Sequence, residues 1–177
     1  CALPIFLDDE ARAGTYEFFT LSTHLLDASL EETQSYYREI LDKPFDFEKE
    51  ELYELDGEKK DWAANDAELK EYWRQYLKYQ VLRDLYRSLE SQDKAREKAE
   101  AGEELEEDEA ELLEKSLKEL EEDAREEVLE DFDSRYKSME KLRREDWLTT
   151  YLNSFTNVYD PHTGYLKPKD KEDFDIN

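Results

Sequence analysis

The stretch NDAELKEYWRQYLKYQVLRDLYRSL, residues 65–89, decides the fold class. Its apolar residues recur at steps of three and four, the period of one buried face of an α-helix. They are Leu69, Trp73, Tyr76, Leu77, Val81, Leu85, Tyr86 and Leu89. Asn65 or Asp66 can serve as the N-cap, and Glu68 lies in the first turn, where the helix dipole favours an acid. We predict one amphipathic helix ending near Leu89, and we interpret its aromatic row as core packing rather than a cofactor box.

Upstream of this stretch the helical period recurs over residues 15–41, which we predict to be another helix. Pro44 ends it. Residues 45–56 are too short and isolated to be stable strands, so we predict an extended loop packed by Phe45 and Phe47.

Downstream, residues 90–131 are strongly acidic and hold more than half of the net charge of −25. We predict that Gly102 separates a short helix or loop, residues 92–101, from a long helix of about 38 residues that begins near Leu105. A narrow coiled-coil-like seam follows four- and three-residue steps. It consists of Leu113, Leu117, Leu120, Ala124 and Val128. We predict that residues 90–131 are a projecting acidic helical hairpin.

The long helix is predicted to continue through Phe132, Tyr136, Met139 and Leu142 and to break at residues 143–146. A last helix would then pack through apolar residues at helical spacing. They are Leu148, Tyr151, Leu152, Phe155 and Val158. Four glycines and four prolines leave few turns, so the sequence predicts an all-α, multi-helix bundle. Its expected core anchors are Trp73, Leu77, Tyr136, Leu152 and Phe155.

The stretch DPHTGYLKP, residues 160–168, comes directly after this last helix. Pro161 crowds the backbone of Asp160 and pushes it toward extended geometry, which ends the helix. Gly164 supplies conformational freedom, and Pro168 closes the run. We therefore predict an exit turn with a short extended segment near residues 164–168.

This stretch and the helix before it resemble the end of the N-terminal helical region of the tail-specific (C-terminal processing) serine proteases. The residues that carry the resemblance are Asp160, Pro161, His162, Thr163, Tyr165, Leu166 and Pro168. Lys167 stands where that family more often has serine. By this resemblance, residues 15–159 would be a helical N-terminal domain, with residues 90–131 inserted. Residues 160–177 would be the exit toward missing PDZ and protease regions.

The resemblance implies a bacterial, periplasmic endopeptidase that uses a Ser/Lys dyad and a PDZ domain to cut proteins with apolar C-terminal ends. Those parts would lie beyond this chain, so no catalytic residue is carried over. It implies instead a scaffold that flanks the PDZ and protease parts and helps to form a vault for protein substrates. In that family the region also offers a surface to a helical-repeat lipoprotein adaptor.

The composition argues against several other classes of function. The charge of −25 argues against nucleic acid and anionic membranes as partners, and every apolar run is too short to span a bilayer. We expect no cofactor, since no Gly-rich phosphate loop occurs, and no dedicated metal site, although a loose Ca²⁺ site on the hairpin stays open. His24 is expected at a surface, whereas the ring of His162 is predicted to bond nearby backbone and hold its turn.

Residues 1–14 are predicted to be a poorly ordered or fragment N-terminus. Cys1 is the only cysteine and excludes an internal disulfide. It is either the start of a processed fragment or the lipid-bearing first residue of a mature lipoprotein. Two rival functions stay open. The chain could be a free-standing acidic interaction protein that dimerises through the Leu113–Val128 seam, or it could itself cut peptides.

Overall fold

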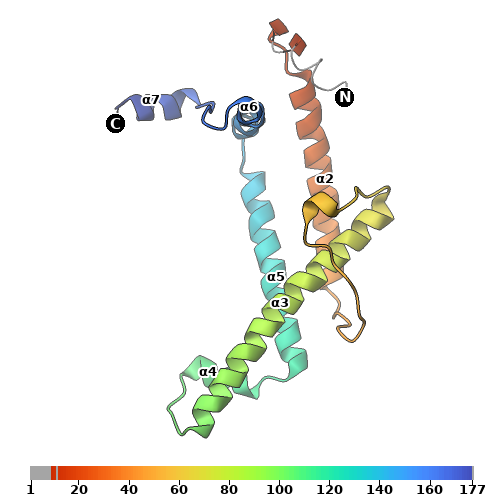
Figure 1. The fold of residues 1–177 in the computed structure, drawn as a ribbon, viewed down its shortest axis with the longest axis vertical. Coiled ribbons are helices and arrows are strands. Elements are labelled where there is room, and N and C mark those ends of the chain that lie inside the picture. Colours follow the sequence, from red (N-terminus) through yellow and green to blue (C-terminus); the bar gives the residue numbers. More distant parts are fainter. Residues whose placement is uncertain (1–8, 11, 177) are drawn as a thin grey trace. The chain divides into compact units, whose positions relative to one another are not determined.

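A computed structural model describes residues 9, 10 and 12–176 of the chain. This described part holds six α-helices and no strand, which confirms the predicted all-α class (Figure 1). The helices are α2 (Glu17–Leu41), α3 (Asp66–Glu100), α4 (Glu107–Glu114), α5 (Leu117–Glu140), α6 (Arg144–Tyr159) and α7 (Pro168–Ile176), with a short 3₁₀ turn, η1 (Gly57–Lys59), between α2 and α3. The expectations for Cys1 and most of residues 1–14 lie outside the described residues.

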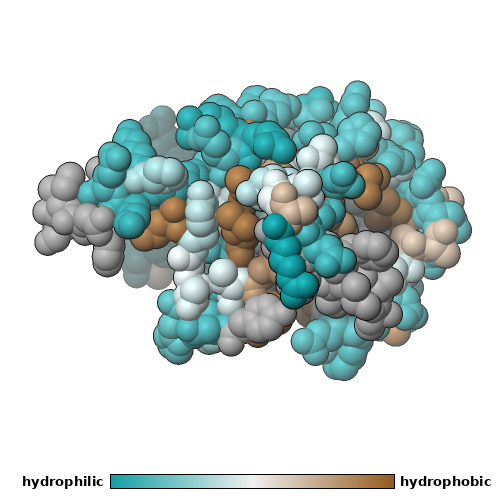
Figure 2. Space-filling view, turned by 90° about the horizontal axis from the view of Figure 1, so that it is seen from above, coloured by the Kyte–Doolittle hydropathy of each residue, from teal (hydrophilic) through white to brown (hydrophobic). Residues whose placement is uncertain are grey.

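The chain divides into two compact units, each described by itself. Cys1–Glu32 with Tyr136–Asn177 form the first, which we name the terminal unit, and Thr33–Arg135 form the second, the central unit. Helices α2 and α5 each contribute residues to both. Figure 2 shows a face dominated by hydrophilic residues with small hydrophobic areas between them, as expected from a mean hydropathy of −1.05.

An aromatic cluster forms the core of the central unit where α2, α3 and α5 meet. The Phe132 ring lies 5.2 Å from Tyr37, 5.7 Å from Trp73 and 6.2 Å from Tyr76, measured between ring centroids. Tyr37 and Leu77 are fully buried. Aromatic pairs at such distances add about 0.5–1.5 kcal/mol each beyond the area they bury. The predicted aromatic row on α3 is therefore core only in part: Trp73 and Tyr76 are half-buried against Phe132. Tyr86, which belongs to the same predicted row, is 60% exposed.

Of the five expected core anchors, Leu77 and Tyr136 are buried. The other three, Trp73, Leu152 and Phe155, are half-buried.

Two polar contacts tie the C-terminal end of α2 to α5. Arg125 donates from Nη1 to the carbonyl of Leu41 at 2.9 Å, so a cation caps the negative end of the helix dipole. Its Nε also bonds Glu121, whose carboxylate accepts the backbone N–H of Phe45 at 3.0 Å. These contacts fix the point at which the chain leaves α2.

The hydroxyl of Tyr37 donates to Asp133 at 2.7 Å. Burial, and then this bond, raises the pKa of Tyr37 to about 12. A tyrosine held neutral in this way is part of the packing between α2 and α5.

Helix α3 begins as predicted and ends later than predicted. Asn65 is the N-cap, and its side chain accepts the N–H of Glu68 at 3.1 Å. The helix passes Leu89 and ends at Glu100, so the prediction of a separate short helix or loop over residues 92–101 was wrong. Gly102, with φ of 75°, ends it in a Schellman motif: its N–H bonds Ala99 and the next N–H bonds Lys98.

The continuation of α3 has a tertiary cause. Gln92 is buried, and its amide donates to the carbonyls of Leu112 and Lys115 at 2.8 and 2.9 Å. Those carbonyls belong to the end of α4, which packs on α3. A glutamine in a hydrophilic run therefore acts as a cap for another helix.

The predicted single helix of about 38 residues is two helices, α4 and α5, with a break at Lys115 and Ser116. Ser116 starts α5: its N–H donates to the Glu119 carboxylate at 2.8 Å, and its hydroxyl donates to the same group at 2.7 Å. This is a capping-box arrangement. Of the predicted seam, Leu120, Ala124 and Val128 are buried within this chain, whereas Leu117 in the first turn is 61% exposed.

Candidate functional site: the exit segment after α6

Helix α6 is bounded by two aspartates. At its start, Asp146 accepts the N–H of Arg143 at 2.7 Å, so an acid satisfies a free donor of the first turn. At its end, the N–H of Asp160 bonds the carbonyl of Thr156 at 2.8 Å, and Asp160 is extended, with ψ of 112°. Helix α5 ends at Glu140 and α6 begins at Arg144, so the break lies at residues 141–143, ahead of the predicted break at residues 143–146. The predicted end before Pro161 is confirmed.

The carboxylate of Asp160 organises the turn after α6. It accepts the backbone N–H of His162 at 2.9 Å and the hydroxyl of Thr163 at 2.7 Å. The N–H of Thr163 bonds the carbonyl of Asp160 at 3.0 Å. Hydrogen bonds from the backbone of His162, and then from Thr163, hold the pKa of Asp160 below its usual value. This is an aspartate-centred turn of the kind that commonly precedes a change of direction.

The ring of His162 is not the group that holds the turn. Its Nδ1 lies 3.2 Å from Asp160 Oδ1, and its side chain is 91% exposed. We predicted that this ring bonds nearby backbone, whereas its contact is with a carboxylate and the backbone bonds go to Asp160. His24, the other histidine, lies on the exposed face of α2 as expected.

Beyond the turn, the chain runs back along α6. The side-chain amide of Asn153 accepts the N–H of Tyr165 at 2.6 Å and donates to its carbonyl at 3.4 Å. Lys167 forms an ion pair with Asp146, nearly two turns nearer the helix start. Lys167, and then the N–H of Arg143, hold the pKa of Asp146 below its usual value. Residues 160–167, which we name the exit segment, are thus fastened to α6 at Asn153 and Asp146.

A further helix, not predicted from the sequence, comes after the exit segment. Pro168, which we expected to close an extended run, is the first residue of α7. Proline suits this position because its fixed φ is helical and its missing N–H would have no partner there. A proline after an extended run was the available signal.

All seven residues of the DPHTGYLKP resemblance are exposed. Asp160 and Thr163 are explained by the turn itself, and Pro168 by the start of α7. The backbone of Tyr165 is hydrogen-bonded to Asn153. The side chains of Tyr165 and Leu166, however, face solvent. These two apolar side chains are therefore accessible at the surface of the exit segment.

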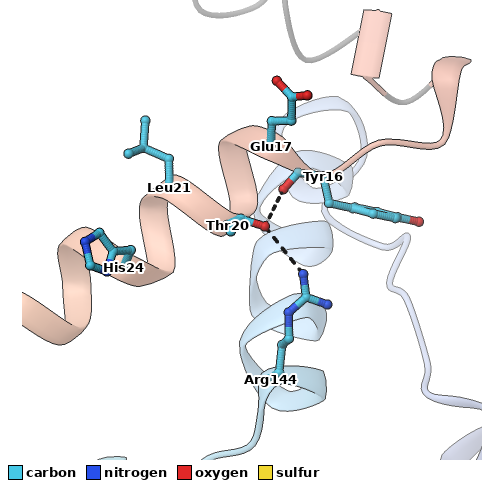
Figure 3. Close-up of a pocket in the computed structure, with 6 residues that line it drawn as sticks. All are labelled: Tyr16, Glu17, Thr20, Leu21, His24 and Arg144. Atoms are coloured by element: carbon cyan, nitrogen blue, oxygen red, sulfur yellow. Dashed lines mark hydrogen bonds between the residues drawn. The ribbon is translucent and has the colours of Figure 1, made fainter.

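A shallow pocket of about 600 Å³ lies in the same unit, between the start of α2 and Arg144 (Figure 3). The Thr20 hydroxyl donates to the carbonyl of Tyr16 at 2.9 Å. Arg144 donates from Nη2 to the same hydroxyl at 3.5 Å. The guanidinium of Arg144 also lies 5.1 Å from the Phe19 ring, and that ring packs on Tyr151 at 5.2 Å. A hydroxyl that donates to a carbonyl has no base to activate it, so this arrangement is suited to binding rather than catalysis.

Among the residues whose side chains the structure describes, no group of three or more His, Cys, Asp or Glu is arranged to hold a metal ion. Over the same residues, every helix is too short or too polar to cross a bilayer.

Comparison with known proteins gives one family. A family model described as the tail specific protease N-terminal domain matches residues 4–169. The matched stretch covers the whole central unit, most of the terminal unit and the entire exit segment. No solved structure matches the chain.

Proposed function

Because this chain belongs to the family of tail-specific protease N-terminal domains, we propose that it is the non-catalytic scaffold of a periplasmic serine endopeptidase. The whole enzyme would degrade or process proteins from their C-terminal ends. Its Ser/Lys dyad and its PDZ domain would belong to other parts of the same polypeptide. This chain would hold the PDZ and protease parts in their positions.

The fastening of the exit segment to α6 carries this proposal. Asn153 and Asp146 hold residues 165 and 167 at fixed places on a helix, so α7 starts from a defined point. A linker between independently moving domains would be rich in glycine, serine or proline and would have no such contacts. A segment built in this way suits a domain that sets the direction of the polypeptide beyond it.

Further partners are inferred from the family alone. Protein substrates would reach the protease through a vault that this domain helps to form. A helical-repeat lipoprotein adaptor would dock on its surface. The exposed Tyr165 and Leu166 are suited to contact the PDZ or protease part.

The rival function, a free-standing coiled-coil interaction protein, has lost its main support. Its seam needs Leu120, Ala124 and Val128 on an outer face, and the structure buries all three within one chain. Only Leu117 of the seam is left exposed, and one leucine is too little for a dimer interface.

The proposal is tested by degradation assays with two forms of the protein. The polypeptide that contains this chain together with its PDZ and protease parts should cleave a model protein ending in apolar residues faster than the same protein ending in aspartates. The 177-residue chain alone should cleave neither. Turnover by the isolated chain would refute the scaffold role, and equal rates on both substrates would refute the tail-specific activity.

A further inference from the structure

The loop between α2 and α3 is firmly attached to α3. Glu51 accepts from Arg74 Nη2 at 2.5 Å and from Lys78 Nζ at 2.6 Å, and Lys49 Nζ lies 3.0 Å from it. The Lys78 ammonium also donates to the carbonyl of Lys49 at 3.3 Å. Figure 1 shows this loop lying beside the first half of α3. One carboxylate thus gathers three cations and fixes the middle of the loop.

Aromatic contacts attach the loop at a second place. Tyr53 stacks on Tyr79 with ring centroids 5.6 Å apart. The ammonium of Lys60 lies 4.1 Å from the centre of the Tyr53 ring and 5.3 Å from that of Tyr72. Such distances are those of cation–π contacts. The loop is therefore ordered on both sides of residues 52–58.

Large apolar side chains on this attached loop nevertheless face solvent. Leu52 is 97% exposed, Leu55 is 67% exposed and Trp62 is 98% exposed. On α3, Leu82 and Tyr86 are exposed as well. The attachment of the loop uses Glu51, Tyr53 and Lys60 and leaves these leucines without a role in folding. Apolar side chains held in place at a surface are typical of a binding site.

Two hollows lie on either side of Tyr53. The first is a groove of about 340 Å³ with an apolar part formed by Leu52, Leu55, Tyr79 and Leu82. The rest of its lining includes the charged and polar residues Lys49, Glu50, Glu51, Gln75 and Lys78. The second is an aromatic pocket of about 260 Å³. It is lined by Tyr53, Lys60, Leu69, Tyr72, Trp73 and Tyr76. The groove suits apolar side chains, and the aromatic pocket already holds an ammonium group.

The charges on this loop favour a cationic partner. Its exposed carboxylates are Glu48, Glu50, Glu54, Glu58 and Asp61. They stand between and beside the exposed leucines, while Lys49, Lys59 and Lys60 are engaged with Glu51, Asp56 and the tyrosine rings. A partner segment with both apolar and basic side chains would match leucines and carboxylates together.

We propose that this loop and the adjoining face of α3 bind a basic amphipathic segment of a partner protein. The apolar side chains of the segment enter the groove beside Leu52 and Leu55. One of its lysines or arginines takes the place of Lys60 between Tyr53 and Tyr72. The proposal is independent of the scaffold role, since it rests on contacts inside the central unit.

The probe is a fluorescein-labelled helical peptide of leucine and lysine in amphipathic order, and the measurement is fluorescence anisotropy with the 177-residue chain at about 0.15 M salt. The double variant Leu52→Ser/Leu55→Ser should bind it at least tenfold more weakly. The fold should be unchanged in circular dichroism, because both side chains are exposed. The matched control is Leu25→Ser/Val158→Ser, which changes two exposed apolar residues of the terminal unit and should bind within twofold of the parent.

Two further peptides distinguish general electrostatic attraction from binding that also needs apolar contacts. A peptide in which serine replaces every leucine should bind far more weakly than the probe, and so should one in which glutamate replaces every lysine. If the lysine–serine peptide equals the probe, or if the Leu52→Ser/Leu55→Ser variant binds like the parent, the attraction is only that of a strongly acidic chain and the proposal is refuted.

The aromatic pocket is tested by Lys60→Ala. Removal of the internal ammonium should strengthen binding of the probe severalfold, because the incoming cation no longer competes with it. Unchanged or weaker binding would refute the exchange of cations between Tyr53 and Tyr72.

Discussion

The core of the central unit and the exit segment of the terminal unit are held by opposite means. The first is built from rings and aliphatic side chains with almost no solvent contact, such as Tyr37 and Leu77. The second is exposed along most of its length and is held by single polar contacts from Asn153 and Asp146. Burial provides most of the free energy of folding, whereas one exposed hydrogen bond or ion pair provides little.

The difference separates stability from positioning. A change in the central core should unfold the domain. A change in the exit segment should leave the domain folded and release only the direction of the chain beyond α6. If the scaffold proposal is right, damage of the second kind is the more specific way to impair the whole protein.

The largest effect is expected from Leu120→Ala, compared with Leu117→Ala. Both leucines belong to the predicted seam, but Leu120 is 1% exposed and Leu117 is 61% exposed. The first change should lower the free energy of unfolding by about 2–5 kcal/mol, since it leaves a cavity. The second should change it by about 0.5 kcal/mol at most. Urea denaturation measures the free energy of unfolding of both variants. Similar losses would show that Leu117 is also buried in solution and would contradict the comparison.

The next effect is expected from Glu51→Gln. The change removes the charge that Arg74, Lys78 and Lys49 share, and it should lower Tm at pH 7. Hydrogen bonds from Arg74, and then from Lys78, hold the pKa of Glu51 far below its ordinary value of 4.5. Because the folded pKa is depressed, the stabilisation is complete above about pH 4.5 and is lost as the pH falls through the folded value.

The difference in Tm between the parent and Glu51→Gln should therefore be constant near neutral pH and shrink below about pH 4.5. Glu50→Gln is the matched control, since it removes the same charge from the exposed neighbour. If the two variants lose the same Tm, net charge rather than the three-cation contact governs the effect.

A smaller effect is expected from Ser116→Ala. The loss of the N-cap of α5 should cost about 1 kcal/mol, with a range of about 0.5–2 kcal/mol. Thermal unfolding followed by far-ultraviolet circular dichroism measures it. The Ser116 hydroxyl also accepts the N–H of Glu119 at 3.4 Å. Ser116→Asp should retain part of the stability, because its carboxylate can accept that N–H although it cannot donate to Glu119. A loss equal to that of alanine would mean that accepting this N–H does not contribute.

These helices also show how far the sequence alone could predict the fold. The start of α3 and both ends of α6 are set by local signals, among them Asn65, Asp146, Asp160 and Pro161. The end of α2 has a local signal in Pro44 and is also held by Arg125, 84 residues away. The end of α3 also has a local signal, Gly102. The continuation of α3 past Leu89, in contrast, is supported by Gln92, which bonds carbonyls 20 and 23 residues away. A single sequence gives no sign of that contact. The break itself had a local signal, Ser116 followed three residues later by Glu119.

The candidate site, too, could be predicted only in part from the sequence. The turn at Asp160 joins residues two and three positions apart, so its existence could be predicted from DPHTG, although its organising group was taken to be His162. The fastening to α6 joins residues 12 and 21 positions apart. Neither asparagine nor aspartate on a helix indicates such a partner. Here the sequence predicts that the chain turns, and only the structure shows where it goes next.

The smallest effect on stability, and the most informative one for function, is expected from Asn153→Ala. Two hydrogen bonds to Tyr165 are lost, but both are exposed, so the free energy of unfolding should change by only about 0.5 kcal/mol. Hydrogen exchange at the Tyr165 amide should nevertheless rise about tenfold, because its partner is gone.

Ser154→Ala is the control, since its hydroxyl bonds within α6 and does not reach the exit segment. A large loss of stability would place the exit segment in the folding core, and unchanged exchange at Tyr165 would mean that Asn153 does not hold it. With global stability intact and exchange raised, a loss of the proposed proteolysis in the whole protein would indicate that the fixed direction of the chain beyond α6 is what the scaffold provides.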